Sequence, residues 1–121
     1  MSTIANLYAD IKTLCQQWFY TKSETNAWTS QTVGTYGTLY VNTALRLCEF
    51  RYYRTNYQFS NTSETTLHTG AIPSAYRPKQ TIICAVYQVT IIGAVATNGN
   101  IVATTSSTGT KTINMTAFWH Y

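Results

Sequence analysis

TIIGAVATNGNIVATT, which spans residues 90–105, decides the fold of this chain. The two halves of this stretch are rich in Ile, Val and Thr, which favour β-strands. Between them stands Asn98-Gly99, the strongest turn signal in the sequence, because a type I′ turn needs positive φ at both central positions. The stretch therefore predicts a β-hairpin with strands over 90–97 and 101–105.

Strand signals continue on both sides of this hairpin. Runs rich in Thr, Val, Ile and Tyr recur from Thr32 to the C-terminus, with Gly, Asn and Pro between them. Strand–helix alternation is absent there, which argues against a parallel α/β fold. Many short strands separated by turns are typical of an antiparallel β-sandwich, and we predict a jelly-roll-like one. The other predicted strands are 38–41, 44–54, 81–89 and 111–119, and residues 57–59 either continue the strand 44–54 or start another.

Three of these strands carry more specific predictions. In 44–54 the apolar pattern slips by one residue, which predicts a β-bulge near Cys48 and Glu49. The run 81–89 is nearly apolar on both faces and is expected to be a central strand. In the last strand alternate residues fall on one face; they are Ile113, Met115, Ala117 and Trp119.

Residues 1–32 follow a helical pattern. Apolar residues recur at spacings of three and four over two heptads, and Ser2 or Thr3 can cap the helix start. Thr21 with Glu24 forms a capping box that begins a second short helix, predicted to run through Trp28 to about Ser30. The apolar stripe either packs on the chain's own sheet or pairs with copies of itself; it consists of Ile4, Leu7, Ile11, Leu14 and Trp18.

These patterns divide the chain into an N-terminal helical oligomerisation segment, 1–32, and a β-sandwich head domain, 33–121. Charged residues make up only 10% of the sequence, against roughly 25% in an ordinary soluble domain. The net charge is +4 and the basic residues are scattered, so nucleic-acid binding is not expected. The longest apolar-rich run, 82–96, is too short and too polar for membrane insertion.

Catalytic chemistry has little support. The chain has four carboxylates and two histidines, and only Glu49 and Glu64 are left for an acid–base pair. His68 and His120 lack metal-ligand spacing and are interpreted as strand-end or surface residues. There is no phosphate-binding glycine motif and no nucleophile elbow. We predict a non-enzymatic protein without metal or cofactor.

The cysteines number three, an odd count without CxxC spacing. Their neighbours are apolar, so Cys15, Cys48 and Cys84 are predicted to be buried free thiols. Such thiols indicate assembly in a reducing compartment.

The aromatic content is the positive functional signal. The chain contains ten tyrosines, and tyrosine combines a flat apolar face with a hydroxyl, which suits both sugar rings and protein interfaces. Alternation along a strand would also place half of each aromatic run in the core and leave the rest for a subunit contact, and this alternative stays open. The predicted ligand-binding residues are Arg51, Tyr52, Tyr53, Arg54, Tyr57 and Trp119.

Several motifs resemble those of bacteriophage tail proteins. The segment 20–24, YTKSE, is similar to one that joins helical and β modules in phage tail-fibre and baseplate proteins. The segment 72–78, IPSAYRP, reads as an ordered connection and resembles part of the C-terminal β domains of phage receptor-binding proteins. A hairpin with Asn-Gly and a closing aromatic strand follow there; residues 98–101 and 117–121 fill those places here. The resemblance covers most of the chain loosely, and the short N-terminal segment departs from the long shaft of typical fibres.

The resemblance implies a homotrimeric component of the phage tail, assembled in the host cytoplasm, whose heads bind host-surface glycans. Its other partners would be virion tail proteins. The alternative is a purely structural tail or baseplate module with its tyrosines between subunits. In the heptads, Ile at a with Leu at d favours two helices, whereas the resemblance implies three, and we follow the resemblance on this point.

Overall fold

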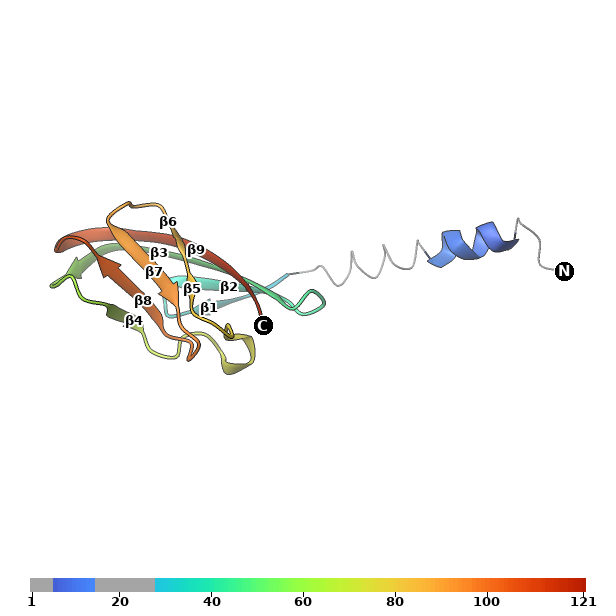
Figure 1. Ribbon diagram of the computed structural model, residues 1–121, viewed down its shortest axis with the longest axis horizontal. Helices are drawn as coiled ribbons and strands as arrows, with labels where there is room; N and C mark the ends of the chain where they lie inside the picture. The colour runs from blue at the N-terminus through green and yellow to red at the C-terminus, as the bar shows by residue number, and fades with distance from the viewer. Residues whose placement is uncertain (1–5, 15–27) are drawn as a thin grey trace.

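The computed structural model of the protein describes residues 6–14 and 28–121. Residues 6–14 form a helix, and the remainder forms two antiparallel sheets that face each other (Figure 1), which confirms the predicted β-sandwich. A short 3-10 helix, η1, spans Ser74–Tyr76. The strands are β1 (Thr29–Val33), β2 (Gly37–Asn42), β3 (Leu47–Phe59), β4 (Thr65–His68), β5 (Ile82–Ile83), β6 (Ala85–Val86), β7 (Ile91–Val95), β8 (Ile101–Thr105) and β9 (Gly109–His120).

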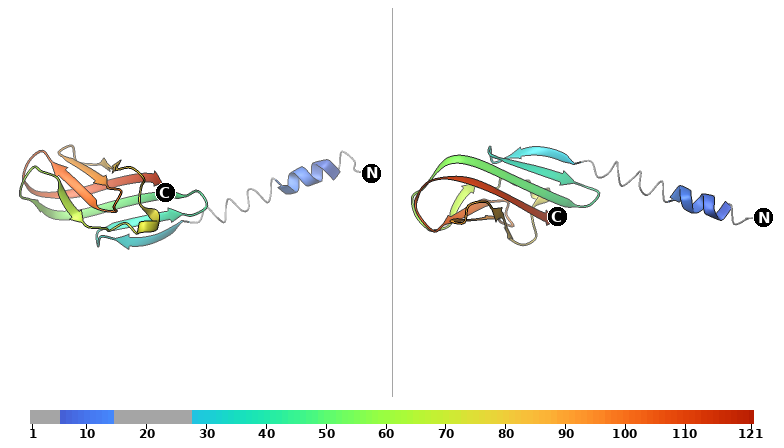
Figure 2. Two further views of the ribbon diagram at one scale, coloured as in Figure 1. Left: turned by 60° about the horizontal axis from the view of Figure 1, so that its bottom comes forward. Right: turned by 90° about the horizontal axis from the view of Figure 1, so that it is seen from above.

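One sheet has five strands in the order β1-β2-β3-β9-β6, and the other has four in the order β4-β8-β7-β5. Figure 2 shows the two layers from further directions, with the long β3 and β9 strands curving side by side along one layer. The core lies between the layers, and each large side chain buried there contributes roughly 1.5–3 kcal/mol to stability. Its largest members are Tyr52, Phe50, Phe59, Leu39, Ile72, Ile101, Ile113 and Met115.

The quoted stretch forms the β7–β8 hairpin, but its turn is not the predicted type I′. Gly99 has a φ of 85°, while Asn98 stays outside the positive-φ region. The Gly99 amide donates to the Ala96 carbonyl at 2.9 Å, and the Ala96 amide donates to the Asn100 carbonyl at 2.9 Å. This is a three-residue loop, in which a type I turn precedes a left-handed glycine. The Asn98 side chain accepts the Asn100 amide at 3.1 Å instead of supplying a second left-handed residue.

The segment 72–78 is the ordered connection that its two prolines predict. The Ile72 amide donates to the Gly99 carbonyl at 3.1 Å, and Arg77 Nε donates to the Ile72 carbonyl at 2.8 Å. A Cβ at position 99 would lie 2.7 Å from that carbonyl and 2.6 Å from Arg77 Nε. Gly99 is therefore needed twice, for its φ and for the close approach of this segment.

The β-bulge of β3 lies further along the strand than predicted. Pairing with β9 is regular up to Arg54 and shifts before Tyr57, and Asn56 between them has a φ of 57°. The bulge predicted at 48–49 is therefore wrong. The apparent slip arose because Leu45 lies in the turn before β3, where it is exposed, whereas Cys48, Phe50 and Tyr52 face the core in regular alternation.

The predicted central strand 81–89 is two edge strands instead. β5 pairs with β7 at the edge of the four-stranded sheet, and β6 pairs with β9 at the edge of the five-stranded sheet. The chain crosses between the layers at Cys84, which is buried and whose amide donates to the Gly93 carbonyl at 2.8 Å. Each sheet therefore uses only part of this apolar run, and Ile83, Tyr87 and Val89 are left exposed.

At the N-terminal end, β1 begins at Thr29 and pairs with β2 from that residue on. Thr29 and Ser30 are therefore in a strand, so the second helix predicted through Trp28 to about Ser30 is wrong at that end, and its predicted start lies outside the described residues. The division predicted after residue 32 falls inside β1. The helix 6–14 stands apart from the sandwich (Figure 1). Several predicted features lie outside the described residues: the caps at Ser2, Thr3, Thr21 and Glu24, Cys15, and the stripe members Ile4 and Trp18.

The described part of the apolar stripe does not pack on the sandwich. Leu7, Ile11 and Leu14 are 56%, 52% and 64% exposed, respectively. Of the two interpretations of the stripe, packing on the chain's own sheet is therefore wrong for these three residues.

Candidate functional site

The outer face of the five-stranded sheet gathers tyrosines and polar side chains. In β9 the odd-numbered residues Ile113 to Trp119 point into the core, so the side chains between them point outward. Strand pairing then sets their neighbours: Tyr53 lies opposite Asn114, and Arg51 lies opposite Thr116. On its other side Arg51 lies opposite Thr38. The pairing thus brings three strands' outward residues into one surface.

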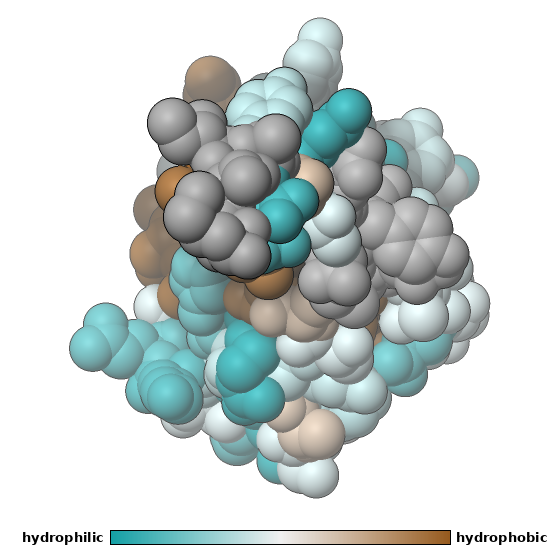
Figure 3. Space-filling view, turned by 90° about the vertical axis from the view of Figure 1, so that its right-hand side faces the viewer, coloured by the Kyte–Doolittle hydropathy of each residue, from teal (hydrophilic) through white to brown (hydrophobic). Residues whose placement is uncertain are grey.

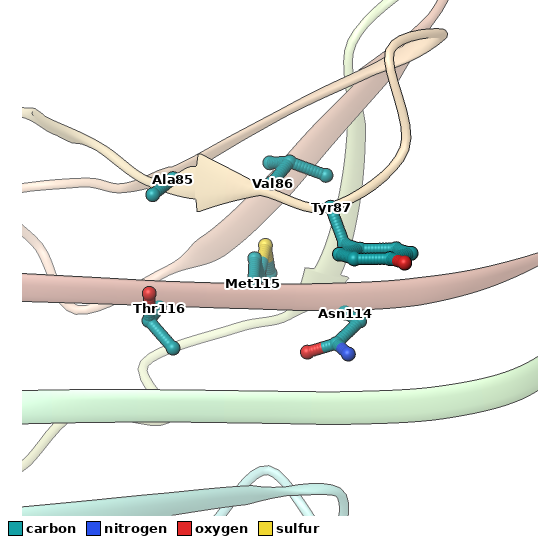
Figure 4. Close-up of a pocket in the computed structure, with 6 residues that line it drawn as sticks. All are labelled: Ala85, Val86, Tyr87, Asn114, Met115 and Thr116. Carbon is teal, nitrogen blue, oxygen red and sulfur yellow. The ribbon is translucent and has the colours of Figure 1, made fainter.

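This surface is hollowed into a groove of ≈ 260 Å³. A second hollow of ≈ 330 Å³ adjoins it, and Asn114 and Thr116 line both. Figure 4 shows the second hollow, with the Tyr87 ring beside Asn114 between β6 and β9. We call the two hollows together the tyrosine groove; it is lined by Tyr36, Thr38, Tyr40, Arg51, Tyr52, Tyr53, Ala85, Val86, Tyr87, Asn114, Met115 and Thr116.

A charged pair lies at the β2–β3 side of the tyrosine groove. Arg51 Nε donates to Glu49 Oε1 at 2.7 Å, and the guanidinium carbon lies 5.1 Å from the centroid of the Tyr40 ring. The hydrogen bond and the charge of Glu49 raise the pKa of Arg51. Because Nε is occupied by Glu49, the terminal amino groups of Arg51 are the donors left for a ligand. The pair offers donors and acceptors side by side with no net charge.

A second polar cluster supports the rim of the groove. The Arg54 guanidinium carbon lies 4.3 Å from the ring centroid of Tyr36 and 4.7 Å from that of Tyr57. The Tyr52 hydroxyl lies 3.0 Å from His68 Nε2 and accepts Arg54 Nη1 at 3.5 Å. We call these five residues the Arg54 cluster. These contacts hold Tyr36 at the groove. The Arg54 guanidinium is engaged by side chains of the protein itself.

The Arg54 cluster makes stability depend on pH. Burial, and secondarily the charge of Arg54, holds the pKa of His68 below the ordinary histidine value of about 6.5. As pH falls below about 6.5, the unfolded chain takes up a proton at this histidine before the folded protein does. We therefore expect the free energy of unfolding to be highest above that pH and to decline as pH falls through the folded-state pKa of His68.

Urea titrations at a series of pH values measure this decline. His68→Gln should flatten it in that window, while the matched variant His120→Gln should leave it unchanged, because His120 is exposed at the end of β9. An unchanged pH profile for His68→Gln would contradict the assignment. The placement of both histidines at strand ends agrees with the sequence prediction.

The six predicted ligand residues separate into three groups. Arg51 and Tyr53 line the tyrosine groove. Arg54 and Tyr57 are half-buried members of the Arg54 cluster. Tyr52 also borders the groove, but its side chain lies in the core, as does that of Trp119. The two residues are only 1% and 4% exposed, respectively, so their assignment as ligand-binding side chains is corrected.

Sequence reasoning missed Tyr40, Tyr87 and Asn114. The signal for Asn114 was present, because the apolar face predicted for 111–119 implies that the residues between its members point outward. The same alternation places Trp119 in the core. Tyr40 follows similarly from Leu39, which is fully buried. Tyr87 could not be found this way, because the crossing of 81–89 between sheets depends on the partner strands.

The two cysteines in the described part of the chain are buried and free, as predicted. Burial raises the pKa of Cys48 to about 11 and that of Cys84 to about 12, so both stay protonated at neutral pH. Over residues 6–14 and 28–121, no group of three or more metal-ligating side chains comes together. No helix in those ranges has the length and apolarity to cross a membrane.

The outer face of the four-stranded sheet has a different character. Ile83 and Ile92 on this face are 66% and 61% exposed, respectively, and Val89 in the turn before β7 is 101% exposed. A hollow of ≈ 190 Å³ lies beside Val89 and Ile92. We call these three residues the apolar patch. In Figure 3, viewed from the end that carries the helix, hydrophobic residues gather along one side of the molecule and hydrophilic residues lie mainly elsewhere.

Comparison with known proteins finds no matching family model, no matching curated protein and no matching solved structure.

Proposed function

We propose that this protein is a non-enzymatic host-attachment module of a phage tail, which recognises host-surface glycans through its tyrosine groove. The observation that carries the proposal is the groove itself. Exposed rings of Tyr53 and Tyr87 supply flat apolar faces, and Asn114 on the strand between them supplies hydrogen-bonding groups. The Arg51–Glu49 pair on the same strand as Tyr53 adds further donors and acceptors. Sugars present the matching combination, apolar ring faces edged with hydroxyls.

The same groove argues against hydrolysis of the glycan. A glycosidase needs two carboxyl groups on either side of the scissile bond. Glu49 is paired with Arg51, and Glu64 lies in the exposed loop that precedes β4 rather than along the groove. The proposed activity is therefore binding alone.

The alternative, a purely structural module with its tyrosines between subunits, is less well supported. A subunit contact has a depleted set of charged residues at its centre, and the apolar patch meets that condition better than a face that carries Arg51 and Glu49. The apolar patch can serve contacts between heads, which leaves the tyrosine groove free for a ligand.

We further propose that the protein acts as a homotrimer organised by its N-terminal helix. Leu7, Ile11 and Leu14 form one exposed apolar stripe, and burying each would contribute roughly 1.5–3 kcal/mol. Two heptads are too short to hold helices together alone. The heads must then share the contact, and several grooves on one particle would raise avidity for a repetitive cell surface.

Binding of the intact oligomer to an array of bacterial surface polysaccharides tests the proposed function. Tyr53→Ala removes a stacking face and should weaken binding by about thirtyfold, equivalent to about 2 kcal/mol. The matched variant Tyr53→Phe keeps the ring and should bind within a few-fold of wild type.

The oligomeric mass of the same variants separates the two functions. If the groove binds glycan, Tyr53→Ala loses binding and keeps its mass by light scattering. If the tyrosines lie between subunits, Tyr53→Ala loses mass, and wild type binds no polysaccharide on the array. The second pair of results would replace the proposed function with the structural one.

A further inference from the structure

We infer that the tyrosine groove binds an extended, uncharged oligosaccharide, which crosses the strands from Tyr40 on β2 to Tyr87 beside β6. The inference rests on the proposed function and specifies its ligand. It is carried by three features of the groove: its continuity, its charge and the separation of its two ends.

Continuity follows from the shared lining of the two hollows. Asn114 and Thr116 on β9 form one wall of each, so the hollows meet along β9. The strand order β2-β3-β9-β6 places three inter-strand steps between Tyr40 and Tyr87. At ~4.8 Å a step, the separation across the strands alone is roughly 14 Å, which is longer than a single sugar ring and matches an extended chain.

The charge of the groove favours a neutral ligand. Arg51 is the charged residue in its lining. Glu49 lies next to that lining and neutralises Arg51 at 2.7 Å. The remaining lining residues are tyrosines, threonines, one asparagine and small or apolar residues. An anionic sugar would have to compete with Glu49 for Arg51 and would leave a partly buried carboxylate unpaired, since Glu49 is only 17% exposed. Sugar hydroxyls can instead donate to Glu49 and accept from Arg51 together.

The two ends of the groove are distinct binding positions. Near β2 and β3, Tyr40, Arg51 and Glu49 combine a ring with hydrogen-bonding groups. At the far end the Tyr87 ring is 84% exposed. Its backbone is fixed because the Tyr87 amide donates to the Asn114 carbonyl at 3.0 Å. A short sugar held at the first end would not reach Tyr87, whereas a longer chain would stack on it.

The test compares intact wild-type oligomer with Tyr87→Ala on an array of neutral and acidic glycans, from monosaccharides to octasaccharides. We expect wild type to bind neutral glycans, with affinity that rises with chain length. Tyr87→Ala should weaken binding of the longer glycans by about tenfold, the effect of one lost stacking contact, and leave that of disaccharides unchanged. Tyr87→Phe serves as the matched control. Affinity for the best neutral glycan should change less than twofold when salt is raised, because no ion pair forms.

Other outcomes would overturn the inference in separate ways. Binding of acidic glycans alone, with strong salt dependence, would show that Arg51 leaves Glu49 for an anion. Equal affinity for monosaccharides and octasaccharides, or an equal loss at every length for Tyr87→Ala, would show a single compact site. In both cases glycan binding itself would stand. Absence of binding to every glycan on the array would overturn the proposed function as well.

Discussion

Trp119→Ala should destabilise the head by about 3–5 kcal/mol, which is the usual cost of removing a large aromatic side chain from a core. The Trp119 ring is 4% exposed, and its centroid lies 6.5 Å from that of Phe50. Its Nε1 also donates to the Tyr76 carbonyl at 2.7 Å, so the substitution leaves that acceptor without its partner. Since a domain of this size is stable by only about 5–15 kcal/mol, the loss is a large fraction of the total.

Urea denaturation measures this loss, and the neighbouring residue supplies the control. Phe118 is 57% exposed on the opposite face of β9, so Phe118→Ala should cost no more than about 1 kcal/mol. A ligand-binding role for Trp119 would give the reverse result: Trp119→Ala would keep its stability and lose glycan binding. The pair of variants therefore tests which face of β9 carries function.

Ile11→Asp should dissociate the oligomer. Ile11 lies at the centre of the described stripe, between Leu7 and Leu14, and is 52% exposed in the single chain. A carboxylate placed in the seam between helices would be buried without a partner, which costs several kcal/mol per subunit. In a symmetric trimer the substitution enters the seam three times, so the cost multiplies.

Light scattering gives the mass of wild type and variant at the same concentration. We expect three chains for wild type and one for Ile11→Asp. Thr13→Asp adds the same charge to the side of the helix away from the stripe, where Thr13 Oγ1 donates to the Ala9 carbonyl and is exposed; it should stay trimeric. A single-chain mass for wild type would contradict the proposed oligomer. An assembled Ile11→Asp would show that the helix lies outside the contact.

Local sequence patterns were enough to predict most strands. Alternation of apolar and polar residues is set by the two-residue repeat of a strand, which needs no knowledge of the partner. The face of β9 that holds Ile113 and Met115 was therefore predicted correctly. The hairpin at Asn98-Gly99 was also predicted, because a left-handed glycine is a local requirement, although the turn uses one such residue and not two.

Features that depend on pairing were not predictable in this way. The bulge of β3 lies at Asn56, which has a positive φ and sits where the pairing with β9 shifts register. Nothing in the apolar pattern of 44–54 marks this position. The groove likewise depends on register: Tyr53 and Asn114 are distant in sequence and become neighbours only through the β3–β9 ladder. Dense aromatic runs marked β3 and the end of β9, but the runs alone could not say which of their members face outward together.

The sequence by itself determined that the chain is an antiparallel β-sandwich after a short helix, because strand propensity, turn residues and periodicity are local properties. Only the tertiary structure decided that 81–89 crosses from one sheet to the other, which brings Tyr87 to the end of the groove. The physical reason is that a run of residues apolar on both faces is equally compatible with one central strand and with two short edge strands in different sheets. The choice is made by which strands, far away in sequence, offer free hydrogen-bonding groups and a core to cover.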